Sequence, residues 1–60
     1  MYRALYAFKS DNPNALAFDA DERFTVIDDK KDPHWWLVQN DRDEVGYVPA
    51  NYVKRDEVLF

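Results

Sequence analysis

The sequence contains no cysteine, one histidine and one glycine among its 60 residues. Without cysteine the chain can form neither a disulfide nor a thiolate metal site, and a single histidine cannot build a zinc cluster. A chain with one glycine also lacks the glycine-rich loop that cradles phosphate groups. We therefore expect no metal, no cofactor and no disulfide, so that stability must come from apolar packing.

Long hydrophobic runs and an excess of basic residues are also absent. No apolar stretch approaches the roughly 18 residues of a membrane-spanning helix, and Lys9 interrupts the first apolar run before a signal-peptide core can form. The net charge is −4, whereas proteins that bind nucleic acid usually carry a basic surface. We expect no membrane insertion, no nucleic-acid partner and, without disulfides or a secretory signal, a cytoplasmic location.

Aromatic residues, in contrast, make up 17% of the chain. Short segments with the residue pattern of β-strands alternate with clusters of turn-forming residues. The strand signals lie at residues 4–8, 24–27, 35–38, 45–48 and around Val53, and turns are expected at residues 10–14, 19–22, 28–33 and 39–44. Asp21 is the residue that we expect at positive φ, and residues 50–52 should form a tight helical turn. No helical period and no repeat is visible, so the pattern predicts a small all-β barrel or sandwich.

The alternation of side chains separates a predicted core from a second group of rings. The core positions are Ala4, Leu16, Phe18, Phe24, Val26, Val38, Val48 and Val53. Outside this set remain Tyr6, Phe8, Trp35, Tyr47 and Tyr52. These rings could form an exposed apolar patch of the kind that marks an interaction site, or they could be the half-buried outer layer of the barrel.

Four strings carry a family resemblance. ALYAF at residues 4–8, ALAF at 15–18, WW at 35–36 and GYVPANYV at 46–53 resemble, in order and spacing, the ALYDY, LSF, WW and GYIPSNYV strings of the SH3 domain. The resemblance implies a five-stranded barrel of two orthogonally packed antiparallel sheets with one short 3-10 turn, in a single domain over residues 1–56 followed by a tail over 57–60. Within the family, the first loop most resembles the amino-terminal SH3 domain of a Nck-interacting adaptor of actin assembly.

The resemblance also implies a ligand and a site. SH3 ligands are proline-rich segments in the polyproline II helix, bound by a monomeric, non-catalytic module. By position, Tyr6 and Tyr52 form the first proline slot, and Phe8, Trp35, Pro49 and Tyr52 form the second. Trp35, Asn51 and Tyr52 donate hydrogen bonds to ligand carbonyls. Tyr47 either faces the specificity pocket or packs across strands, while Trp36 lies opposite Trp35 and is expected to pack on the barrel exterior.

The sequence departs from the family where a basic ligand residue is usually held. Ala15 and His34 stand at positions that are often acidic, and Asp11 is the only carboxylate of the first loop. The carboxylates of the second loop, Asp28, Asp29 and Asp32, could replace the missing acid, or they could belong to a solvated loop in which Lys30 and Lys31 partly cancel them. We therefore expect a ligand with reduced dependence on Arg or Lys.

Other functions fit the sequence less well. The carboxylate pairs Asp28/Asp29 and Asp41/Asp43 lie in charged loops, and Ser10 has no evident base nearby, so we expect no enzyme. The aromatic residues could imitate a methyl-lysine cage, although the motif at residues 46–53 argues against one. The groove could also bind a folded partner or hold its parent protein inactive. Ubiquitin binding is not expected, because ubiquitin-binding relatives carry Phe at the position of Tyr52.

Overall fold

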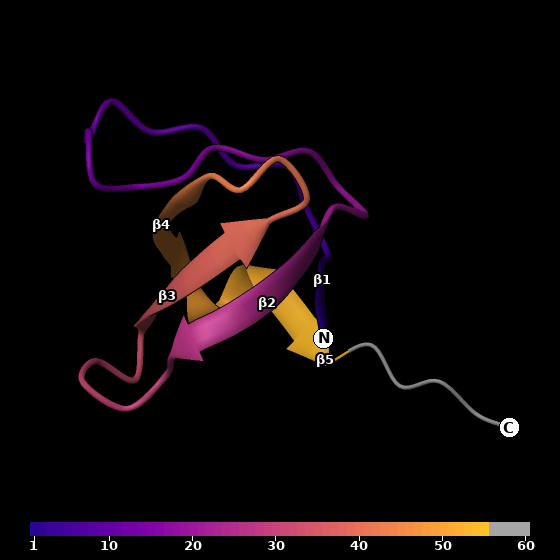
Figure 1. Ribbon diagram of the computed structural model, residues 1–60. Helices are drawn as coiled ribbons and strands as arrows, with labels where there is room; N and C mark the ends of the chain where they lie inside the picture. The colour runs from indigo at the N-terminus through magenta and orange to yellow at the C-terminus, as the bar shows by residue number, and fades with distance from the viewer. Residues whose placement is uncertain (56–60) are drawn as a thin grey trace, which may run out of the picture.

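The computed structural model describes residues 1–55, which form an all-β fold (Figure 1). The strands are β1 (Tyr2–Ala4), β2 (Arg23–Asp28), β3 (Trp35–Asn40), β4 (Val45–Pro49) and β5 (Val53–Arg55). One 3-10 turn within residues 1–55, η1 (Ala50–Tyr52), connects β4 directly to β5. The five predicted strands and the 3-10 turn are thus confirmed, while the predicted tail at 57–60 lies outside the described residues. None of the helical segments in this part of the chain is long and apolar enough to cross a membrane.

The strands are joined in the order β4-β3-β2-β1-β5, and each pair of neighbours is antiparallel. The register between β2 and β3 shifts between Val26 and Asp28, and such a bulge bends a strand and increases its twist. In Figure 1 the direction of β5 crosses that of β2, so the ladder folds over on itself. This arrangement is the barrel that the resemblance implied.

The core lies inside the folded ladder and draws on every strand. Its buried residues are Ala4, Leu16, Phe18, Phe24, Val38, Val48 and Val53, all of which were predicted. Phe24, Val38 and Val48 are the largest fully buried side chains, and the Phe18 and Phe24 rings meet edge to face at 5.2 Å between centroids. Val26 was predicted to be buried as well, but it is only half-buried against the core, next to the register shift in β2.

The first strand is shorter than the predicted run of residues 4–8. It ends at Ala4, and the Leu5 N–H then donates to the Tyr52 carbonyl at 2.7 Å. Farther along, Phe8 forms an isolated bridge with Phe18, in which each N–H donates to the other residue's carbonyl. The chain between these contacts makes no ladder, so Tyr6 is left exposed beside the sheet.

Trp36 lies on the face of β3 opposite Trp35, as predicted, but its environment differs from the prediction. It is half-buried against the core cluster instead of packing on the barrel exterior. Its ring meets Tyr2 edge to face at 5.3 Å, and its indole N–H is buried with no hydrogen-bond partner in the described part of the chain. The reason is that the same face of β3 carries Val38, a core residue.

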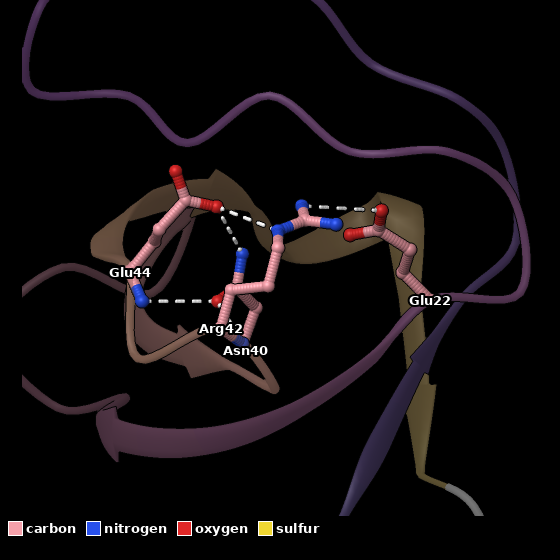
Figure 2. A network of polar contacts seen from close by, with 4 residues as sticks. All are labelled: Glu22, Asn40, Arg42 and Glu44. Carbon is pink, nitrogen blue, oxygen red and sulfur yellow. Dashed lines mark hydrogen bonds and ion pairs between the residues drawn. The ribbon is translucent and has the colours of Figure 1, made fainter.

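The β3–β4 turn is held by the side chain of Asn40, a buried polar residue (Figure 2). Its Oδ1 accepts from the backbone N–H groups of Arg42 at 2.9 Å and Glu44 at 3.0 Å, and its Nδ2 donates to Glu44 Oε1 at 2.8 Å. Arg42 donates to the same Glu44 oxygen at 3.0 Å and approaches Glu22 Oε1 at 3.6 Å. The network links the turn to the residue that precedes β2.

Two non-glycine residues within 1–55 have positive φ. One is Asp21 at 70°, as predicted, and the other is Asp43 at 62°, in the β3–β4 turn. Aspartate tolerates this region better than most residues because its short side chain can hydrogen-bond locally. Aspartate therefore tolerates the positive φ in both turns, although glycine would adopt this conformation at lower energetic cost.

Candidate functional site

Four aromatic rings form a continuous row at the surface. Ring centroids are 5.5 Å apart for Tyr6 and Tyr52, 5.6 Å for Tyr52 and Phe8, and 6.1 Å for Phe8 and Trp35, and all three contacts are edge to face. The ends of the row are open to solvent, since Tyr6 is 58% and Trp35 41% exposed. Phe8 also stacks on the core residue Phe18 at 5.5 Å. The row is therefore anchored in the core through the half-buried Phe8 and open to solvent at both ends.

Backbone hydrogen bonds between distant segments hold these rings in place. The bond from Leu5 N–H to the Tyr52 carbonyl fixes the residue that precedes Tyr6 against η1. The Ala50 N–H donates to the His34 carbonyl at 2.8 Å, which ties the start of η1 to the residue that precedes Trp35. The site therefore exists only when three segments far apart in the sequence come together.

Pro49 and Asn51 lie beside this row, on either side of the start of η1. Pro49 is buried and faces Trp35 in the register of β3 and β4. Asn51 is exposed, and its side-chain amide has no hydrogen-bond partner within residues 1–55. The Asn51 amide is therefore available to an external acceptor next to the rings.

A pocket of about 380 Å³ opens beyond Trp35, between the loop at 10–14 and the loop that follows β2. It is lined by Asn12, Asn14, Ala15, Lys31, Asp32, Trp35 and Tyr47. Of the sequence-predicted specificity residues, only Ala15 and Asp32 line it; Asp11, Asp28, Asp29 and His34 do not. Sequence reasoning placed Asn12, Asn14 and Lys31 in the right loops but did not assign them to a site, since only the fold brings the two loops face to face.

The first wall of the pocket is bonded to β4. The Tyr47 N–H donates to the Asn14 carbonyl at 2.9 Å, and the Leu16 N–H donates to the Tyr47 carbonyl at 2.9 Å. Tyr47 also lies opposite Leu37 in the β3–β4 register and is 40% exposed. Tyr47 therefore lines the pocket and lies across from Leu37 in the sheet.

The second wall is shaped by two aspartates that cap backbone groups. Asp28 Oδ1 accepts from the N–H groups of Lys30 at 2.9 Å and Lys31 at 3.3 Å, and these bonds lower the pKa of Asp28 below its usual value. Asp32 Oδ1 accepts from the His34 N–H at 2.8 Å. Asp28 thus acts within the loop, whereas Asp32 combines capping with a place on the pocket wall. No group of three or more metal-ligating side chains converges anywhere in the described chain.

Comparison with known proteins agrees with this geometry. Residues 4–54 match the family model described as a variant SH3 domain. The chain belongs to the SH3 family. SH3 domains are non-catalytic interaction modules. The SH3 fold and the family resemblance of the four sequence strings are therefore confirmed.

Several curated proteins contain a similar segment. The SH2/SH3 adapter protein dreadlocks of Drosophila melanogaster is 43% identical over 54 residues, covering 90% of this chain and 10% of the relative. The Drosophila tyrosine-protein kinase Btk is 41% identical over 56 residues, covering 93% and 7% respectively. The human dynamin-binding protein is 35% identical over 60 residues, covering 95% and 4%. The chain thus spans a tenth or less of the length of these relatives.

The similar solved structures include the carboxy-terminal SH3 domain of myosin IB from Entamoeba histolytica. It is 32% identical with a TM-score of 0.78, covering 88% of this chain and 85% of that one, and a second structure of the same domain holds a bound peptide. The narrower resemblance of the first loop, to the amino-terminal SH3 domain of the Nck-interacting adaptor of actin assembly, is not supported. The relatives found are instead the SH2/SH3 adapter, the kinase and the dynamin-binding proteins.

Proposed function

We propose that this SH3 domain binds proline-rich segments of partner proteins, in the polyproline II conformation, through the row of rings from Tyr6 to Trp35. The observation that carries the proposal is the unbroken edge-to-face row, anchored on Phe18 and open to solvent at both ends. The peptide complex of the myosin IB domain supports peptide binding by an SH3 domain of the same fold.

The groove performs this function by matching a ligand that is already ordered. A polyproline II helix leaves its carbonyls free and loses little conformational entropy on docking. Tyr6 and Tyr52 form the first proline slot, while Phe8, Trp35, Pro49 and Tyr52 form the second. The Trp35 indole N–H, the Asn51 amide and the Tyr52 hydroxyl donate to the ligand carbonyls and set the register of the ligand.

The pocket beyond Trp35 gives the domain a reduced dependence on a basic ligand residue. The pocket wall carries Ala15 where an acid is common in the family, and Lys31 offsets the single carboxylate, Asp32. A charge-assisted hydrogen bond contributes about 1.5–3 kcal/mol, so its absence weakens Arg-containing ligands by roughly tenfold or more.

Within a longer protein, the domain serves as a monomeric cytoplasmic adaptor module in signalling or cytoskeletal assembly. Its similarity to an SH2/SH3 adapter and to dynamin-binding proteins supports an assembly role. For such a small interface we expect a dissociation constant of about 10 μM, which corresponds to a binding free energy of about −7 kcal/mol. Because this binding is weak, further domains must add avidity.

Titration with a proline-rich peptide, followed by two-dimensional NMR, tests the proposal. The chain has two tryptophans in different environments, since Trp35 is 41% exposed while the Trp36 indole N–H is buried. The Trp35 indole signal and the amides of Asn51 and Tyr52 should shift, whereas the Trp36 indole serves as the internal control. The same peptide with alanine in place of proline should leave all of them unchanged.

A pair of variants separates the groove from the rest of the surface. Trp35→Ala should abolish measurable binding while the domain stays folded, because Trp35 is exposed. Ile27→Ala removes a 52% exposed apolar side chain from β2, away from the groove, and should bind the peptide as the wild type does. Equal binding by the wild type and Trp35→Ala would exclude the groove as the proline-rich site.

A further inference from the structure

We infer that the pocket beyond Trp35 selects a neutral carboxamide side chain, glutamine or asparagine, next to the proline-rich core of the ligand. This inference rests on the proposed function, because the pocket continues from the end of the aromatic row at Trp35. The inference names the ligand residue that takes the place of the Arg or Lys bound by typical SH3 domains.

The pocket wall carries one charge of each sign. Lys31 and Asp32 are neighbours in the sequence, and both line the pocket. A ligand cation attracted by Asp32 is repelled by Lys31, and a ligand anion meets the opposite pair of forces. Charged ligand residues therefore gain little, whereas a neutral dipolar side chain is not penalised by either charge.

The pocket also offers unused hydrogen-bonding groups. Within residues 1–55, the Lys31 ammonium and the Asn14 side-chain amide have no hydrogen-bond or ion-pair partner. Asn12 uses only its Oδ1, which accepts from the Asn14 N–H at 2.9 Å, so its NH₂ group is free. Asp32 uses Oδ1 for the His34 N–H, which leaves its second oxygen available.

These free groups match both ends of a carboxamide. The carbonyl oxygen of a ligand glutamine can accept from Lys31 or from the Asn12 or Asn14 amides, while its NH₂ donates to Asp32. The planar amide can also pack against the side chains of Trp35 and Tyr47, which line the same pocket. A guanidinium has donors only and a carboxylate has acceptors only, so each leaves part of the pocket unpaired.

The test uses one synthetic peptide with a Pro-x-x-Pro core and a single variable residue, placed on each side of the core in turn. Gln, Asn, Arg, Glu and Ala versions are compared by NMR titration at one salt concentration. On the side that reaches the pocket, we expect Gln or Asn to bind about threefold more tightly than Arg, Glu or Ala. The signals of Asn12, Asn14 and Lys31 should shift with these peptides.

A matched pair of lysine variants tests the charge balance. Lys31→Glu should tighten the binding of the Arg peptide about fivefold and remove the preference for Gln, because the repulsive charge becomes attractive. Lys30→Glu makes the same change in net charge at a neighbouring residue that does not line the pocket, so its peptide preference should remain that of the wild type.

Each failure points to a different conclusion. If proline-rich peptides bind but Arg equals or exceeds Gln, or if Lys30→Glu acts as Lys31→Glu does, the carboxamide inference is overturned while the proline-rich function stands. If the peptides bind equally well after their prolines are replaced by alanine, the proposed function itself is wrong.

Discussion

Gly46 is the residue whose lack of a side chain most directly shapes the candidate site. A Cβ at this position would lie 2.9 Å from Leu16 Cβ, 3.0 Å from Leu16 N and 3.2 Å from the Asn14 carbonyl oxygen. Its φ is not positive, so the requirement is close approach and not an unusual backbone conformation. The first loop can therefore bond to Tyr47 and form the pocket wall only because this residue is glycine.

Replacing Gly46 with alanine should destabilise the domain, which is the opposite of the usual effect of a Gly→Ala substitution. Gly→Ala in a strand normally stabilises a protein by restricting the unfolded chain, but Gly46→Ala should cost about 1–3 kcal/mol of unfolding free energy through overpacking. Urea denaturation measures the loss. Val45→Ala, at the exposed neighbouring residue of β4, should stay within about 0.5 kcal/mol of the wild type, and a similar result for both variants would contradict the close-approach argument.

Among the elements, the β3–β4 hairpin depends most on its turn. Asn40 satisfies two backbone N–H groups of the turn, and Asp43 closes it at positive φ. The Asp43 N–H donates to the Asn40 carbonyl at 3.1 Å, and the Asn40 N–H donates to the Glu44 carbonyl at 3.0 Å. Because β4 carries Tyr47 and Pro49, this turn sets the register that aligns the groove and the pocket.

The positive φ of Asp43 gives a prediction with an internal control. Asp43→Ala should be about 1 kcal/mol less stable than Asp43→Gly, because a Cβ is unfavourable in the left-handed region. The same two substitutions at Asp41, which is not among the positive-φ residues, should not show this advantage for glycine. Thermal or urea unfolding of the four variants measures the difference in stability between Ala and Gly at each position. An equal advantage for glycine at both positions would contradict the role of the positive φ of Asp43.

Glu44 links the stability of the hairpin to pH. The hydrogen bonds from Asn40 and Arg42 lower the pKa of Glu44 below its usual value of 4.5. A carboxylate whose pKa is lowered in the folded state stabilises the fold above its unfolded pKa, and this contribution disappears as the pH falls through the folded value. The Arg42 guanidinium, whose pKa is raised chiefly by its bond to Glu44, stays charged throughout this range.

The stability of the variant Glu44→Gln should therefore depend on pH differently from that of the wild type. The variant should be less stable than the wild type at about pH 7, and the difference should shrink between about pH 4.5 and pH 2 as Glu44 is protonated in the wild type. Denaturant unfolding across this range measures it. Asp41→Asn, in the same turn but without a hydrogen-bond partner in the described chain, should match the wild type at each pH. A constant difference for Glu44→Gln would remove the electrostatic explanation.

At the scale of the whole molecule, the fold and the groove share one small core. A domain of this size buries only about 60% of the surface of its unfolded chain and has a stability of a few kcal/mol. Phe18 belongs to the core and also stacks on Phe8 of the groove. The groove rings therefore add to the packing of the barrel while they remain open to a ligand.

A comparison within β2 tests how the stability is distributed. Phe24 is 1% exposed and Ile27 is 52% exposed, on opposite faces of the strand. Phe24→Ala should cost about 3–5 kcal/mol, which is comparable with the total stability, so circular dichroism and NMR should show a largely unfolded chain. Ile27→Ala should remain folded. A folded Phe24→Ala variant with less than about 1 kcal/mol of loss would show that the core lies elsewhere.

The amino-acid sequence by itself determined the features that depend on local chemistry. Alternating apolar residues marked Phe24, Val38 and Val48 as core, and the turn chemistry of Asp21 and the short 3-10 segment were evident from residue type and order. These predictions succeed because strand alternation and backbone preference act over a few neighbouring residues.

Only the tertiary structure decided which loops meet. It ended the first strand at Ala4 instead of Phe8, because the Leu5 N–H bonds to Tyr52, and it turned Trp36 toward the core. It brought the amides of Asn12 and Asn14 into the same pocket as the adjacent charges of Lys31 and Asp32. Contacts between segments this far apart depend on how the sheet bends and how closely backbones can approach, and no local pattern of residues encodes either.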